Sequence, residues 1–523
     1  MSGLVITLVA TLLAGQGPSG PRLGTIDFRN SGAAAAQGPF VRGVLLLHSF
    51  EYRDAAEAFR EAQRIDPRFA LAYWGEALTY THPVWDEQDL GAARDVLQRL
   101  GPTPEARRAS APTPREQAYL GAVETLYGDG SKPARDTAYS RAMQRLAAAF
   151  PRDQDAQVLY AVSLLGLSQG VRDVPTYLRA AAVAQRVFRE NPNHPGAAHV
   201  LIHCYDDPAH ARLGLAAART YSKIAPDAPH AQHMTTHIFL ALGMWDQVVS
   251  QNELAAGPDR AAWAPNHYTA WLGYGYLQQG RHEVALRHLD LMRRNMEVGG
   301  RGRAVLAQMR AEYVVNTEGW DCACLGWSID LTGVRARDEA VDLFVLGLSS
   351  LKRGERAGAA QAVAELVDLN SHRAPPAPGH QRDAVPGILQ KELQALLRQV
   401  DGGGADALRL VREAAVLEDQ MPVEYGPPPD VKPAHELLGE MLLTAGRARE
   451  AQREFARSLE VAPKRALSLL GLGRAATAAG DRATAARAYA ELRIIWHDAD
   501  AGLRGGLAET ATAPPRRSSV RSQ

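Results

Sequence analysis

The sequence predicts an all-α chain, a superhelix or α-solenoid built from about ten to twelve helical pairs. Alanine, leucine and arginine dominate the 523 residues, aromatic residues make up only 7%, and no run of alternating β-branched residues is long enough to build a sheet. Glycine and proline clusters recur between helical segments, and similar residues return every thirty-four positions. A repeat array therefore explains the length better than a series of independent domains.

The chain begins with an apolar segment. Residues 4–15 have the length of a signal-peptide core and are too few to span a bilayer, so residues 1–17 are predicted to be a signal peptide. We therefore expect an exported or periplasmic protein. The alternative is a cytoplasmic one, because no Lys or Arg precedes the segment and no A-x-A cleavage site follows it. Residues 18–37, rich in glycine, alanine and proline, are predicted to be a linker.

Residues 38–300 are predicted to form a first repeat array. In its first unit Gly43, Ala55, Phe59, Ala62 and Pro67 stand where two packed helices need small residues, an aromatic filler and a helix-ending proline. These positions resemble those of the tetratricopeptide repeat, whose period is about thirty-four residues. The resemblance implies antiparallel helical pairs wound into a right-handed superhelix with an extended concave groove.

Three further regions follow. Residues 301–424 are predicted to be irregular helical repeats, interrupted by Gly/Pro-rich breaks. Residues 425–500 are predicted to be a C-terminal pair of tetratricopeptide repeats, because Leu438 and Leu472 are thirty-four residues apart, as are Phe455 and Tyr489. Residues 501–523 contain few apolar residues and are predicted to be a disordered tail.

Five stretches resemble a narrower group of proteins. They are LHSFEY (47–52), YWGEALTYTHPVW (73–85), PNHPGAAHVLIHCYDDPAH (192–210), HIFLALGMWDQV (237–248) and YGPPPDVKPAHELLGE (425–440). Together they are similar to uncharacterised, often exported bacterial tetratricopeptide proteins that carry a His-rich PNHPGAAHxLIHxYDDP segment. The resemblance implies export and a repeat fold, and it brings no established reaction with it.

The charge balance and the number of cysteines exclude some classes of protein. Basic and acidic residues balance at 58 each, which removes the basic surface expected of a nucleic-acid binder. Cys204, Cys322 and Cys324 are too few for a disulfide framework and are expected to be small buried apolar residues. No segment after residue 17 is apolar over a bilayer's width, so the mature chain is expected to have no transmembrane segment.

Histidines concentrate between residues 191 and 276, which hold eight of the sixteen. Steps of three and four residues place neighbours on one helical face. Steps of thirty-four residues place His199 level with His233, and His203 level with His237, on neighbouring repeats. Six histidines occupy groove-facing places in the tetratricopeptide register: His199, His203, His230, His233, His237 and His267.

This ladder of imidazoles predicts a metal site. Packed helices lie roughly 8–10 Å apart, so imidazoles at equivalent places can converge on one ion with metal–nitrogen bonds of about 2.0–2.1 Å. The predicted ligands are the six groove histidines, with Asp207 as a further ligand or as the partner of one. The ion would be one divalent transition metal (zinc, copper, iron or nickel) and otherwise no cofactor is expected. No HExxH motif is present, so a zincin protease is not supported.

Two functions stay open at this point. The groove binds a peptide or protein segment, and the histidines are polar lining; or the histidines hold a metal, as a structural site or as the centre of a hydrolase or oxidoreductase acting on a small ligand. No catalytic residue can be assigned, although Asp206, Asp207 or Glu76 could serve as a general base. His48 and His82 are expected to be solvated, and His194 to lie in a loop; these lie outside the predicted site.

Overall fold

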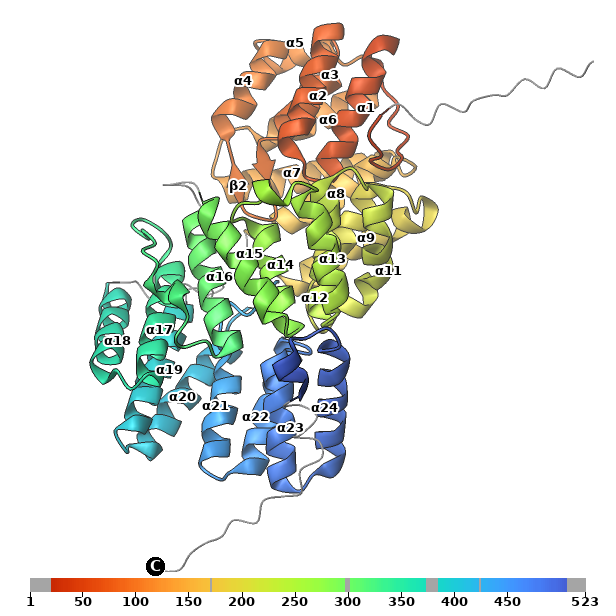
Figure 1. Cartoon of the computed structure of the whole chain (residues 1–523). Coiled ribbons are helices and arrows are strands. Elements are labelled where there is room, and N and C mark those ends of the chain that lie inside the picture. Colours follow the sequence, from red (N-terminus) through yellow and green to blue (C-terminus); the bar gives the residue numbers. More distant parts are fainter. Residues whose placement is uncertain (1–19, 170–171, 297–301, 373–383, 423–424, 506–523) are drawn as a thin grey trace, which may run out of the picture.

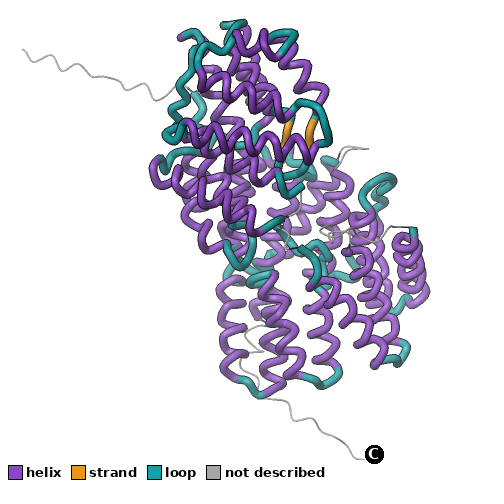
Figure 2. Tube along the Cα trace, turned by 180° about the vertical axis from the view of Figure 1, so that it is seen from behind, coloured by secondary structure: helices purple, strands orange, loops and turns teal. Residues whose placement is uncertain are grey.

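The computed structural model describes residues 20–169, 172–296, 302–372, 384–422 and 425–505. Antiparallel helices pack one after another along this part of the chain, which confirms the predicted all-α superhelix of tetratricopeptide-like pairs (Figure 1). Among the described residues the one sheet is a hairpin of two short antiparallel strands, β1 (Thr81–His82) and β2 (Glu87–Gln88), which Figure 2 shows from behind. The predicted signal peptide, residues 1–17, lies outside the described residues.

The helices fall into three sections along the chain. The N-terminal section comprises η1 (Ala34–Ala36), α1 (Gln37–His48), α2 (Tyr52–Ile65), α3 (Ala70–Leu78), α4 (Leu90–Leu100), α5 (Pro104–Ala109), α6 (Pro114–Leu126), α7 (Lys132–Ala149), α8 (Gln154–Gly166) and α9 (Val174–Glu190). The central section comprises α10 (Pro195–Cys204), α11 (Ala211–Ile224), α12 (Pro229–Ala241), α13 (Trp245–Ala256), η2 (Arg260–Ala262), α14 (His267–Gln278), α15 (His282–Arg294), α16 (Gly302–Thr317) and η3 (Ala323–Gly326). The C-terminal section comprises α17 (Ala336–Lys352), α18 (Arg356–Ser371), α19 (Val385–Val400), α20 (Gly404–Asp419), α21 (Ala434–Thr444), α22 (Ala448–Val461), α23 (Ala466–Ala479) and α24 (Arg482–Ile495).

Glycines explain how closely the paired helices approach. The ring of Phe59 on α2 lies between Gly43 on α1 and Gly75 on α3, where an added Cβ would lie 2.8 and 2.4 Å from the ring. Phe455 on α22 repeats the arrangement between α21 and α23. Any side chain at these glycines would collide with the aromatic ring, so the small residue and the large one together set the spacing of the helices.

The described part of the predicted linker packs against the repeats. Residues 20–33 form neither helix nor strand, and Leu23 and Phe28 are buried, with 2% and 4% of their surface exposed. The Thr25 amide donates to the carbonyl of Asn193 at 3.0 Å, and Arg22 pairs with Asp227. Residues 20–33 are therefore held against the turn before α10, because burial of their apolar side chains in the core is favourable.

The C-terminal repeats fold back onto the central helices. Arg465, buried at the start of α23, donates to the hydroxyl of Tyr274 on α14 and to Asn316 on α16, both at 3.1 Å. The indole of Trp496 donates to the carbonyl of Gln278 at 3.1 Å. In Figure 1 helices α21–α24 accordingly lie below α16, α14 and α12. The C-terminal helices of the superhelix therefore pack against its central helices, a contact that we call the closure of the superhelix.

Two predictions change in detail. Residues 501–505 are helical and Leu503 packs on the core, so these five residues are not part of a disordered tail; residues 506–523, the rest of the predicted tail, lie outside the described residues. Cys204 is buried and free as predicted, whereas Cys322 and Cys324 form a disulfide with each other instead of remaining free apolar residues. Among the described residues, we find no helix with the length and apolarity needed to span a bilayer.

Candidate metal centre

Six imidazoles meet where three helices of successive repeats pack together. The helices α10, α12 and α14 supply them in order: His199 and His203; His230, His233 and His237; His267. Their rings form a continuous cluster, with neighbouring ring centroids separated by 4.4 to 6.2 Å. The cluster divides into two groups of three, and within each group the candidate ligand atoms all lie within 4.8 Å of one another.

The first group is His199, His203 and His230. The Nδ1 atom of His199 lies 2.7 Å from the backbone carbonyl of His48 on α1. A carbonyl only accepts, so Nδ1 carries the proton and Nε2 keeps its lone pair, which faces Nε2 of His203 at 3.1 Å. His230 contacts the hydroxyl of Tyr268 through Nδ1 at 3.2 Å, and its buried Nε2 has no hydrogen-bond partner. The group thus brings the Nε2 atoms of His199 and His203 into contact and leaves Nε2 of His230 without a hydrogen-bond partner.

The second group is His233, His237 and His267. His233 donates from Nδ1 to the side-chain oxygen of Asn252 at 2.7 Å, and His237 donates from Nδ1 to the Asp206 carboxylate at 2.5 Å. The amide nitrogen of Asn252 is itself directed to a backbone carbonyl, which leaves its oxygen for the imidazole. The two Nε2 atoms, of His233 and His237, face each other at 3.2 Å. His267, the first residue of α14, is exposed and completes the group at its outer edge.

Burial keeps most of these rings neutral. His199 and His233 have no exposed surface, and His203, His230 and His237 are at most 8% exposed. Burial, together with neighbouring imidazoles, lowers the pKa of His199 to about 3 against the opposing effect of the hydrogen bond to the His48 carbonyl. Burial and nearby imidazoles also hold the pKa values of His203, His230 and His233 well below the usual range. Neutral imidazole is the form that binds a metal ion.

Asp206, rather than Asp207, contacts the cluster. The carboxylate of Asp207 accepts from Arg172 at 2.6 Å and from His210 at 2.8 Å, and it belongs to neither group of imidazoles. The expectation for Asp207 assumed that helical register continued through it, but α10 ends at Cys204. In the turn that follows, side-chain directions no longer follow the helical period. Glu76, the other candidate base, pairs with Arg60 and Arg99.

A third group, His48, Asp155 and His194, lies beside the first and was not predicted. All three side chains are buried, whereas the sequence suggested a solvated His48; His194 lies in the turn before α10, as predicted, with its side chain buried. His48 Nε2 lies 2.8 Å from Asp155 Oδ1 and His194 Nε2 lies 3.6 Å from it. Although burial raises the pKa of Asp155, its contacts with the two histidines outweigh burial and keep the pKa below the usual range. The curvature of the superhelix brings α1 into contact with α10, and no local sequence pattern predicts this contact.

Aromatic rings cover the imidazoles from two directions. Phe50, in the left-handed backbone region at φ 54°, places its ring 4.2 Å from that of His199. Tyr425, from the Gly/Pro-rich segment before α21, lies 5.3 Å from the ring of His237. Trp85, on the β1–β2 hairpin, is 39% exposed and lies near His230. The cluster is therefore enclosed, and His267 and Trp85 mark the rim at which solvent reaches it.

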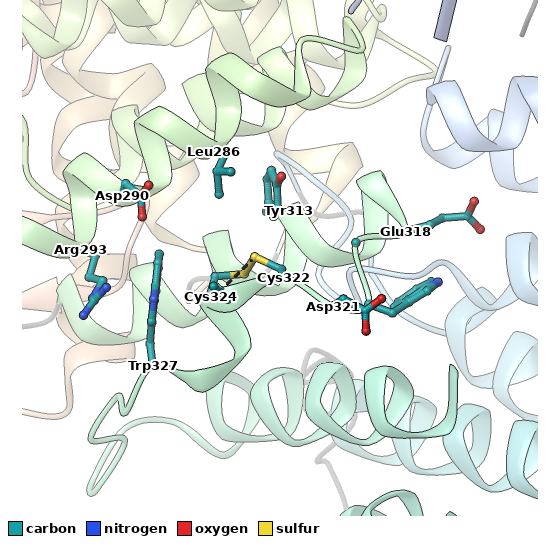
Figure 3. A pocket seen from close by; sticks show the side chains of 12 residues that line it. Leu286, Asp290, Arg293, Tyr313, Glu318, Asp321, Cys322, Cys324 and Trp327 are labelled. Atoms are coloured by element: carbon teal, nitrogen blue, oxygen red, sulfur yellow. Dashed lines mark hydrogen bonds between the residues drawn. A yellow bond between two sulfur atoms is a disulfide. The ribbon is translucent and has the colours of Figure 1, made fainter. Parts of the chain in front are cut away.

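Two hollows lie in the surrounding structure. One, of about 170 Å³, borders the cluster through Asp206 and Tyr425 and runs beneath the segment before α21. The other, of about 500 Å³, lies among α15, α16 and η3, beside the Cys322–Cys324 disulfide, with Tyr313 and Trp327 in its wall (Figure 3). None of the six imidazoles lines this second hollow.

Fold and site together define a tetratricopeptide-like superhelix that encloses an imidazole cluster. A comparison with family models found no match, and a comparison with curated proteins found none. Among solved structures, yeast Tom70 is similar at 13% identity and a TM-score of 0.36, covering 86% of this chain and 96% of its own. Human IFIT1, crystallised as a dimer with m7Gppp-AAAA, is similar at 14% identity and a TM-score of 0.36, covering 90% and 91%. The Cut9–Hcn1 hetero-tetramer of the APC/C is similar at 12% identity and a TM-score of 0.34, covering 86% and 78%.

Proposed function

We propose that this chain is a tetratricopeptide-repeat scaffold that binds a transition-metal ion through its imidazole cluster and presents that ion to a small ligand. The observation that supports metal binding most strongly is the contact between His233 and His237. In both rings Nδ1 donates a hydrogen bond: that of His233 to Asn252, and that of His237 to Asp206. Both are therefore expected to carry a lone pair on Nε2, and these two atoms are 3.2 Å apart.

Two buried lone pairs that face each other repel unless a positive charge lies between them. A metal ion bound at about 2.0–2.1 Å from each nitrogen, in tetrahedral geometry, separates its ligand atoms by about 3.3 Å. The observed spacing fits that arrangement. The fixing of each ring by a carboxylate or an amide on its other nitrogen is also the usual support of a histidine metal ligand. The alternative occupant is a single proton, which would make His237 a cation paired with Asp206.

The enclosure of the site favours a small ligand over a protein segment at this position. Five of the six imidazoles are buried, and Phe50 and Tyr425 lie across them, so an extended peptide would have to displace both rings. The exposed edge at His267 favours a second candidate, a metal-dependent enzyme. A three-histidine site with an open position can activate water for hydrolysis or bind an oxidisable ligand. Partner proteins would then use other surfaces of the superhelix.

Metal content tests the proposal. The untagged full chain would be compared with His199→Ala/His233→Ala, which removes one imidazole from each group, by inductively coupled plasma mass spectrometry. His82→Ala is the matched control, because His82 stacks on Tyr52 outside both groups. At least one equivalent of a transition metal is expected in the wild type and the control, and none in the double variant. Metal-free wild-type protein, after incubation with zinc, copper, iron and nickel followed by gel filtration, would overturn the proposal.

A further inference from the structure

We infer that the cluster is a dinuclear centre, in which each group of three imidazoles holds its own copper ion. This inference rests on the metal site proposed above and extends it. The two groups share no residue, and each offers three candidate nitrogen ligands within 4.8 Å of one another. The candidate nitrogens fall into these two groups rather than into one set of six, so the cluster offers two metal positions instead of a single shared one.

The repeat has duplicated the ligand set. Each group takes two histidines, four residues apart, from the first helix of one repeat: His199 and His203 on α10, then His233 and His237 on α12. Each takes its third histidine from the first turn of the next such helix, where His230 is the second residue of α12 and His267 the first of α14. The facing Nε2 pairs have nearly the same spacing, 3.1 and 3.2 Å. Two equivalent three-nitrogen sites are the simplest consequence.

The donor set selects copper. All six candidate ligands are imidazoles, and among the described residues two carboxylates hydrogen-bond to these histidines: Asp206 accepts from the ring of His237, and Glu51 accepts from the backbone N–H of His230. Imidazole nitrogen suits copper, nickel, iron and zinc, and among their divalent ions the cupric ion forms the most stable complexes, so copper is the metal that the oxidised site would hold most tightly. Two divalent ions would bring four positive charges into a buried site beside the two carboxylates of Asp206 and Glu51, whereas two cuprous ions bring only two positive charges. Because burying charge is costly, the reduced copper pair is the form that this environment stabilises.

The two ions would be close neighbours. The ring centroids of His203 and His237 are 6.0 Å apart, and those of His230 and His233 are 6.2 Å apart, so the two groups are in direct contact. After oxidation, two cupric ions at such a separation have interacting electron spins. This property distinguishes an adjacent pair from two independent sites, and it can be measured without knowing any substrate.

The test uses the full chain loaded anaerobically with cuprous copper in the presence of equimolar zinc and then freed of unbound metal by gel filtration. His203→Gln removes a ligand from the first group, and His267→Gln removes one from the second. His82→Gln serves as the control. Copper and zinc per chain are measured by mass spectrometry, and the copper is then oxidised and examined by electron paramagnetic resonance. The exposed position of His267 keeps the test decisive even where His203→Gln fails to fold.

We expect two copper ions per chain in the wild type and in His82→Gln, and one in each single-group variant. The oxidised wild type should show a half-field transition and a cupric signal smaller than its copper content, whereas the single-group variants should show the full signal of an isolated ion. One ion in the wild type, lost in both variants, would overturn the dinuclear centre and leave the proposed metal site standing. Zinc in place of copper would overturn the choice of metal. A chain that binds neither would overturn both proposals.

Discussion

Replacing Asp206 by asparagine should weaken metal binding without removing a metal ligand. Asp206 and His237 are 2% and 3% exposed, and the carboxylate accepts from His237 Nδ1 at 2.5 Å. The carboxylate fixes the tautomer and the ring orientation, and it makes Nε2 a better donor. Loss of such a partner typically costs 10–100-fold in metal affinity, which corresponds to roughly 1.4–2.8 kcal/mol. We expect Asp206→Asn to lie in this range, because the amide can still accept the hydrogen bond but carries no charge.

The assay is a chelator competition that measures the dissociation constant of the metal for the wild type, Asp206→Asn and Asp207→Asn. The last is a matched control: the same change at the next residue, where the carboxylate pairs with Arg172 and His210 instead of the cluster. Asp207→Asn should leave metal affinity nearly unchanged and lower thermal stability, because it removes the negative charge that pairs with the buried guanidinium of Arg172. An unchanged affinity in Asp206→Asn, combined with a fall in stability, would show that a proton rather than a metal joins His233 and His237.

Two further predictions concern the fold. Gly471→Ala places a Cβ 2.2 Å from the ring of Phe455 and should destabilise the C-terminal repeats by about 1–3 kcal/mol, measured by urea unfolding. The control is Gly121→Ala, which has open space around it and should stabilise the chain by no more than about 1 kcal/mol. Equal effects of the two substitutions would refute the packing argument. Burial raises the pKa of Glu312 to about 7, so the folded state retains a proton that the unfolded state releases, and stability should fall as pH rises from about 4.5 to 7. Glu312→Gln should remove up to about 3 kcal/mol of that fall, measured as the difference between urea unfolding at pH 4.5 and pH 8; an unaltered pH profile would contradict the assignment.

The sequence predicted the imidazole cluster because two periods coincide in it. Helical steps of three and four residues and repeat steps of thirty-four act together, so His199, His203, His233 and His237 had to lie on facing helices once the repeat register was known. The division into two groups was not predicted, because it depends on how far α12 is displaced along α10. That displacement is set by side-chain packing, which the repeat period does not contain.

Other parts of the site depend on contacts between distant residues. Asp206 and Asp207 are adjacent and both acidic, and only the turn after α10 decides which of them meets the cluster. His48 and Asp155 are 107 residues apart and meet because the superhelix curves. Arg465 reaches Tyr274 across 191 residues, and no local pattern marks that pair. Sequence periodicity thus locates the ligands, and long-range packing selects their partners.

The groups that orient the imidazoles come from every section of the fold. The carbonyl of His48 comes from α1, Asn252 from α13, Asp206 from the turn after α10, and Tyr425 from the segment before α21. A buried nitrogen without a partner, such as Nε2 of His230, costs about 1–3 kcal/mol, so the metal-free cluster is held in place by the packing around it. A metal that binds only this folded arrangement would stabilise the whole chain by mass action. If the proposed metal site is occupied, metal binding and the closure of the superhelix, the contact between the C-terminal and central repeats, would therefore be coupled: opening that contact would also loosen the histidines.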